Sequence, residues 1–175
     1  MTELSVSVSN AGGPAPHAAL PEAAQVVMAS FKDAESAGHA VAEVIGAGIV
    51  PAGLEMMDKP ATRAVEDFVH AGYDLEAEAI LLCESDGTKE EVAEEIAQVT
   101  EVMKAAGATR ISVSGSEAER LRFWSGRKAA FPAVGRISPD YLCMDGTIPR
   151  AALPLVLARM REMSVRYGLQ VANVF

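Results

Sequence analysis

Over residues 21–175 the sequence alternates short apolar runs with longer segments of helical periodicity, and this alternation limits the fold more than any other feature. The helical segments repeat apolar residues every three or four positions, whereas the runs between them are short and apolar throughout. The predicted order is β-α-β-α-β-α-β, followed by α-β-α-β. We therefore expect an α+β domain in which helices pack on a sheet.

The expected strands are bounded by polar, glycine or proline residues and cover residues 25–31, 50–57, 76–84, 110–114, 141–145 and 169–175. Helices are expected after Asp33 and after Asp58, over residues 89–106 and 116–130, and from Thr147 to Gly168. Thr88 and Glu91 have the spacing of a capping box. A loop rich in proline and glycine is expected after residue 130, before the strand at 141–145.

Apolar spacing within these helices predicts which residues face the core. The first helix is expected to bury Ala37, Val41, Val44 and Ile45, and the second Val65, Phe68 and Val69. The last helix carries a stripe of Leu153, Val156, Met160, Met163 and Tyr167.

Two split βαβ units of ferredoxin-like type, with an antiparallel sheet, fit this order better than a doubly wound nucleotide-binding fold. The reason is that no glycine-rich turn joins an early strand to its helix, as a dinucleotide site requires. Residues 21–175 are therefore predicted to form one domain. Residues 1–20 are poor in large apolar side chains, and we expect a flexible tail or linker there.

The formal net charge of −9 argues against nucleic acid and against an anionic membrane surface as partners. No apolar run is long enough to predict a membrane span. Cys83 and Cys143 have no disulfide or metal spacing, which predicts a cytoplasmic protein with buried thiols. The three histidines are dispersed, so no metal site is expected from this chain alone.

Residues 123–131 (FWSGRKAAF) place three aromatic and two cationic side chains in one helix and its exit. Trp124 and Arg127 are three positions apart and share a helical face. An arginine beside an aromatic wall is a good receptor for a carboxylate, because its planar fork binds both oxygens. The residues leave a second interpretation open, in which Trp124 belongs to the core and Arg127 is a solvated neighbour.

Glu55 lies in a mostly apolar predicted strand and is a candidate for a placed carboxylate partnered by an arginine. The alternative is a strand residue that faces water. Asp140 and Asp145 are five positions apart on another predicted strand, so their side chains point to opposite faces and do not easily serve one site.

Three separated segments carry a resemblance to a known family: VPAGLEMMD at 50–58, FWSGRKAAFPAVGR at 123–136 and ISPDYLCMDGTIPR at 137–150. With the final VANVF, they resemble the C-terminal (cap) domain of FAD-linked oxidases, of the glycolate oxidase catalytic subunit type, within the vanillyl-alcohol-oxidase-like flavoproteins. The resemblance covers residues 21–175 and excludes the first 20 residues.

This resemblance implies a substrate-side cap region whose FAD is held by a separate domain. It implies oxidation of a 2-hydroxy acid to a 2-oxo acid by hydride transfer to the flavin. Arg127 matches the substrate-carboxylate arginine of a Trp-x-x-Arg pattern, with Trp124 and Glu55 as further candidate substrate-binding residues. The family's histidine motif is expected directly after Phe175, so no catalytic residue is expected within this chain.

Relatives that act on larger dicarboxylates place a lysine near the position of Cys143. Its absence favours a small 2-hydroxy monocarboxylate such as glycolate or lactate. The implied partners are the FAD-binding domain and further oxidase subunits. The alternative is a freestanding ferredoxin-like module that binds a small ligand or a protein without catalysis. An exposed apolar strand at 169–175 would favour the first hypothesis, because it fits an excised piece.

Overall fold

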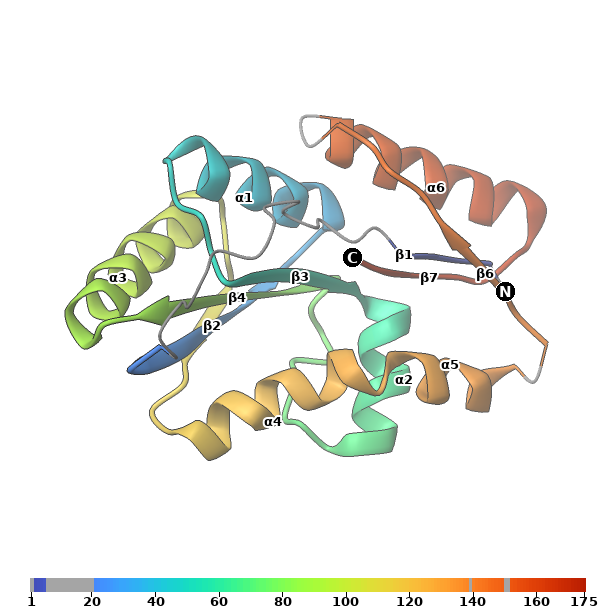
Figure 1. Cartoon of the computed structure of the whole chain (residues 1–175). Coiled ribbons are helices and arrows are strands. Elements are labelled where there is room, and N and C mark those ends of the chain that lie inside the picture. The colour runs from blue at the N-terminus through green and yellow to red at the C-terminus, as the bar shows by residue number, and fades with distance from the viewer. Residues whose placement is uncertain (1, 6–20, 139, 150–151) are drawn as a thin grey trace.

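The computed structural model describes residues 2–5, 21–138, 140–149 and 152–175, and the described strands form one seven-stranded sheet. The strand order is β5-β2-β4-β3-β7-β1-β6 (Figure 1). The strands are β1 (Thr2–Ser5), β2 (Ala23–Phe31), β3 (Gly53–Asp58), β4 (Ala79–Gly87), β5 (Arg110–Val113), β6 (Leu142–Asp145) and β7 (Val171–Val174). The helices are α1 (Ala34–Gly46), α2 (Lys59–Val69), α3 (Lys89–Ala105), α4 (Glu117–Lys128), α5 (Ala130–Ile137) and α6 (Leu153–Tyr167).

The first part of the domain is a ferredoxin-like unit. Its strands pair antiparallel in the order β5-β2-β4-β3, with α1 between β2 and β3 and α3 between β4 and β5. Two split βαβ units interleave in this way, which confirms the expected α+β, ferredoxin-like class. β7 extends the antiparallel sheet beside β3, and β1 and β6 continue it in parallel pairing. Of residues 1–20, the expected tail or linker, Thr2–Ser5 form β1 and the others lie outside the described residues.

Helices cover both faces of the sheet (Figure 1). α1, α3 and α6 lie on one face, and α2, α4 and α5 lie on the other. In the central strand β4, Leu81 and Cys83 belong to the first core, whereas Ile80 and Leu82 belong to the second. Because both faces of β4 are buried, its sequence is a continuous apolar run and does not alternate with polar residues.

Side-chain caps determine where four of the helices begin. Asp33, Asp58, Thr88 and Ser116 each accept a hydrogen bond from the backbone N–H three residues later. The capping box of Thr88 and Glu91 is present as predicted. Each cap contributes about 1 kcal/mol and satisfies N–H groups that have no partner inside the helix.

The expected loop after residue 130 is wrong, because this segment forms the helix α5. Pro132 stands in the first turn of α5, where its missing N–H has no partner to lose. Ala133 and Val134 are buried against the second core, and α5 packs on α2. Tertiary packing thus outweighs the helix-breaking tendency of proline and glycine.

Two apolar stripes are only partly buried. Phe68 on α2 is 40% exposed, with the Arg136 guanidinium 5.3 Å from its ring centroid. On α6 the expected core residues Met163 and Tyr167 are exposed, and Leu153 and Leu157 make the contact. The reason is that the first turns of α6 pack on the core shared with α1, whereas its last turns have no such cover. The helix also begins at Leu153 and not at Thr147.

The expectation of an exposed strand at the end of the chain is wrong. β7 lies inside the sheet between β3 and β1, and Ala172, Val174 and Phe175 are buried. The expectation of two buried thiols holds for Cys83 alone. Cys143 is exposed because it lies in β6, at the edge of the sheet, where all four residues are exposed.

Candidate functional site

The candidate site is built on one face of α4, which lies on the sheet face that it shares with α2 and α5 (Figure 1). Arg120, Trp124 and Arg127 follow one another at intervals of four and three residues, so their side chains point the same way. Each of them meets a carboxylate on the sheet, Glu84 on β4 or Glu55 on β3. The spacing that predicted a shared face for Trp124 and Arg127 therefore extends one turn further, to Arg120.

Arg127 is held by Glu55. Its Nε donates a hydrogen bond of 2.7 Å to Glu55 Oε2, and the two side chains are 21% and 28% exposed. Glu55 thus has an arginine partner, as the placed-carboxylate interpretation requires. Within the described residues, Nη1 and Nη2 of Arg127 make no hydrogen bond. The guanidinium therefore keeps its two-pronged end available.

Trp124 is fixed by both its polar and its apolar atoms. Its Nε1–H donates a hydrogen bond to Glu84 Oε2. Its ring lies over Gly53, where a Cβ would come within 3.2 Å of two ring carbons. Gly53 therefore admits the indole, and Trp124 packs against the second core. Trp124 and Arg127 lie on one helical face but are bound to carboxylates of different strands.

Sequence reasoning missed Glu84 and Arg120. Glu84 accepts hydrogen bonds from Arg120 Nη1 at 2.9 and 2.7 Å, and the remaining Arg120 nitrogens, Nε and Nη2, each donate to Glu117 at 2.8 Å. The hydrogen bonds to Glu117 and Glu84 raise the pKa of the Arg120 guanidinium. A signal was available, since Glu117 precedes Arg120 by three residues on the same helix.

Close packing seats α4 on the sheet. The Tyr73 hydroxyl donates a hydrogen bond to the backbone carbonyl of Phe123, and burial raises the pKa of the Tyr73 phenol. A Cβ at Gly126 would lie 2.2 Å from the Tyr73 ring, so only glycine fits at this position. Because Gly126 precedes Arg127, this contact helps to determine where the guanidinium lies.

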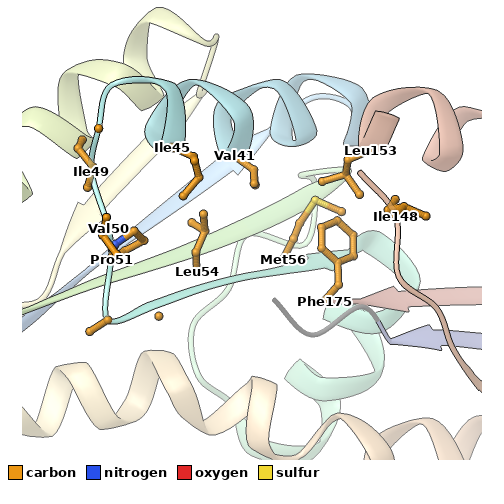
Figure 2. A pocket seen from close by; sticks show the side chains of 13 residues that line it. Val41, Ile45, Ile49, Val50, Pro51, Leu54, Met56, Ile148, Leu153 and Phe175 are labelled. Atoms are coloured by element: carbon orange, nitrogen blue, oxygen red, sulfur yellow. The ribbon is translucent and has the colours of Figure 1, made fainter. Parts of the chain in front are cut away.

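An apolar cavity of about 330 Å³ lies on the opposite face of the sheet (Figure 2). Leu54 and Met56 point into it from β3, whereas Glu55, between them, points to the α4 side. Side chains of α1, the segment 48–53, Ile148, Leu153 and Phe175 also line it. Among the described residues no charged side chain lines this cavity, so they give it no cation to bind a carboxylate.

Residues 20–175 match the family model described as FAD linked oxidases, C-terminal domain. The chain belongs to this family. This confirms the family expected from residues 50–58 and 123–150. Two curated relatives are both described as glycolate oxidase subunit GlcD. The chain is 58% identical over 155 residues to the one from Escherichia coli (strain K12), which covers 89% of this chain and 31% of that protein.

The match to the Bacillus subtilis (strain 168) relative is 26% identical over 153 residues and covers 87% of this chain and 33% of that protein. The chain thus spans about a third of the length of these relatives. A solved structure of alkyldihydroxyacetonephosphate synthase has a TM-score of 0.60 at 15% identity, covering 85% of this chain and 32% of that one. That likeness shows a shared fold.

The residues of this FAD-linked oxidase domain do not by themselves fit a complete FAD site. A dinucleotide pyrophosphate needs free backbone N–H groups or cations, for which helix N-termini are the usual source. In four of the six described helices the cap side chain binds one N–H of the first turn, and two of those caps are the aspartates Asp33 and Asp58. A carboxylate at this position repels a phosphate. The other two helices have no side-chain cap, but α5 follows α4 directly and α6 carries a proline in its first turn, which lacks an N–H.

In the described part of the domain, no group of three or more His, Cys, Asp and Glu side chains is placed to hold a metal ion. A search of the described helices found none that is both long and apolar enough to cross a membrane.

Proposed function

We propose that this chain is the substrate-side cap region of an FAD-dependent 2-hydroxy-acid oxidoreductase of the glycolate or lactate type, with the flavin held by another part of the protein. Arg127 binds the substrate carboxylate. The observation that carries this proposal is the hydrogen bonding of Arg127, which is held through Nε while Nη1 and Nη2 keep their donors. Two parallel N–H donors match the two oxygens of a carboxylate.

The register of the sheet supports this location. β7 pairs antiparallel with β3, with Val174 opposite Met57, and Phe175 exchanges backbone hydrogen bonds with Met56. This pairing places the backbone of Phe175 beside that of Met56, the neighbour of Glu55, which is the partner of Arg127. β7 is thus joined directly to the strand that carries the carboxylate of the proposed site.

The surroundings favour a small monocarboxylate. On the face of α4 that carries Trp124 and Arg127, the other cation is Arg120, which is already bound by Glu84 and Glu117. Arg127 is thus the one cation of this face with free donors among the described residues. A cysteine and not a lysine stands at position 143, which also favours a small monocarboxylate over a larger dicarboxylate. Trp124 forms a rigid wall of the site, and Glu55 orients its arginine.

The proposal also covers the substrate, the partner subunits, the cofactor and the compartment of the whole enzyme. The two relatives are described as glycolate oxidase subunits, which supports glycolate as substrate and further subunits as partners. We place the FAD of the whole enzyme in a separate domain and the enzyme in the cytoplasm, as the sequence analysis expects.

Substitution of Arg127 in the full-length enzyme tests the proposal. Arg127→Lys keeps the charge but loses the two-pronged geometry, so kcat/KM should fall by about tenfold or more, which is about 1.4 kcal/mol. Arg127→Ala should lose considerably more. The melting temperature should change little, because Arg127 is partly exposed and makes one ion pair. Steady-state kinetics and thermal unfolding are measured on the same samples.

Arg122→Ala is the matched control, because Arg122 is on the same helix and forms an exposed pair with Glu119 at 3.0 Å. It should leave kcat/KM within about threefold of the parent value. If Arg127→Ala also stays within that range per folded molecule, the assignment of Arg127 is wrong.

The isolated chain tests the placement of the cofactor. Because four of its described helices begin with a side-chain cap, the 175-residue protein should purify without flavin and should oxidise neither glycolate nor lactate. Absorbance spectroscopy and an activity assay check this. A flavin band near stoichiometric occupancy would contradict it.

A further inference from the structure

We propose that Glu55 is the positioning residue of the carboxylate site: it binds Arg127 through Nε and thereby points the Nη1–Nη2 end of the guanidinium at the substrate. This inference rests on the proposed role of Arg127. The single hydrogen bond from Nε to Glu55 Oε2 is its geometric basis. An arginine held from the side by one acceptor keeps its end-on donor pair free, and that pair fits a second carboxylate.

Arg127 needs such a hold because of its place in the fold. It is the penultimate residue of α4, and its side chain is 21% exposed. A long flexible side chain at a helix end samples many rotamers unless a partner selects one. Glu55 is a suitable partner because its backbone is fixed in β3, opposite Leu82 of β4, while Met56 pairs with Phe175 on the other side.

The exposure of the pair argues against a purely stabilising role. Ion pairs with this much solvent contact contribute little to folding, since water screens the attraction and ordering two side chains has an entropic cost. Arg120, on the same helix, forms a more buried pair with Glu84 of β4, at 20% and 15% exposure, and together with Glu117 this pair leaves no Arg120 nitrogen free. The Glu55–Arg127 pair therefore differs from the Arg120–Glu84 pair in that it leaves Nη1 and Nη2 of its arginine without a partner among the described residues.

A positioning role and a purely electrostatic role predict opposite signs. If Glu55 acted only through its charge, it would weaken substrate binding, because its negative charge offsets the attraction of Arg127 for the substrate carboxylate. Glu55→Ala would then lower KM. Loss of the acceptor frees the guanidinium to rotate, so a positioning Glu55 predicts that Glu55→Ala raises KM. Glu55→Gln keeps an oxygen acceptor for Nε without the charge, and it should recover most of the loss.

The experiment uses the full-length enzyme with glycolate as substrate. Glu55→Ala should raise KM by about tenfold with kcat within about threefold, because binding is lost equally in ground state and transition state. Glu78→Ala is the matched control, since Glu78 is another partly exposed carboxylate in an ion pair, with Lys59 at 2.8 Å. A lower or unchanged KM in Glu55→Ala overturns the proposal. So does a Glu55→Gln variant no better than Glu55→Ala.

A second readout needs no catalysis. In the isolated chain, the Arg127 Nε–H signal in ¹⁵N NMR should be protected from solvent exchange, kept in Glu55→Gln and lost in Glu55→Ala. Fast exchange in the parent chain would overturn the inference. The two proposals also fail separately: if Arg127→Ala keeps its activity, the proposed function is wrong, whereas loss there with an unchanged KM in Glu55→Ala rejects only the role of Glu55.

Discussion

The two halves of α4 present the same residue type to the same sheet in different states. In the first half, Arg120 has every guanidinium nitrogen bound to Glu84 or Glu117. About two turns later, Arg127 has one nitrogen bound, to Glu55. Position on a helix face therefore does not distinguish the two arginines. They differ in the number of guanidinium nitrogens that the fold leaves without a partner among the described residues.

The cause of this difference is local. Arg120 has an acid, Glu117, three residues before it, and this side chain fills the donors that Glu84 does not reach. At the corresponding place before Arg127 stands Trp124, whose N–H is itself a donor and is already bound to Glu84. The helix thus supplies a second carboxylate at one site and an aromatic wall at the other.

The largest effect is expected from Gly126→Ala, which should disturb the Arg120 and Arg127 sites together because both lie on α4. In Gly126→Ala the new Cβ would lie 2.2 Å from the Tyr73 ring, so α4 must shift away from the sheet. Overpacking of this severity should lower the free energy of unfolding by about 3 kcal/mol or more, measured by urea denaturation of the isolated chain. Gly135→Ala is the control, because its Cβ would meet Tyr141 at an ordinary 3.6 Å. Equal stabilities would show that α4 is not held by this contact.

Next in size is a pH effect at Asp58, a carboxylate of β3 that forms no ion pair with an arginine in the described part of the chain. Asp58 accepts hydrogen bonds from Ala61 and from the backbone and side chain of Asn173, and burial raises its pKa to about 6. Since the folded pKa exceeds the ordinary aspartate pKa of 3.8, the folded state binds the proton more tightly, and stability is lost as the pH rises from about 4 through about 6.

By linkage this loss is on the order of 3 kcal/mol. Two measurements check it: the free energy of unfolding against pH, and the ¹³C shift of the Asp58 carboxyl group. A carboxyl signal that titrates near pH 4 would mean that the hydrogen bonds outweigh burial.

A smaller effect separates the two arginine sites directly. Glu84→Ala leaves Arg120 and Trp124 with partly buried donors, so the free energy of unfolding should fall by about 2 kcal/mol. Glu55→Ala breaks one partly exposed ion pair and should cost about 1 kcal/mol or less. Urea denaturation of both variants measures the difference. Equal losses of stability would show that the two sites do not differ, although all guanidinium nitrogens are bound in Arg120 and only Nε is bound in Arg127.

The candidate site was partly predictable. The three-residue spacing placed Trp124 and Arg127 on one face, and the polar residue in an apolar strand identified Glu55 as a placed carboxylate. Glu84 was missed because it lies at the end of a strand pattern, where an acid is ordinarily solvated. Its partners on α4 come from about 36 to 40 residues away in the sequence, and no local pattern connects residues at that separation.

The sequence by itself determined the order of the elements over residues 21–175 apart from α5, the capping of α1 and α3, and the ferredoxin-like class, because these depend mainly on residues that lie close together in the sequence. Only the tertiary structure decided that α5 is a helix, that Met163 and Tyr167 stay exposed, and that β7 is an inner strand. It also decided that every guanidinium nitrogen of Arg120 is hydrogen-bonded, whereas in Arg127 only Nε is. Each of these depends on what a distant segment covers, and burial and hydrogen-bond partners are set by the fold as a whole.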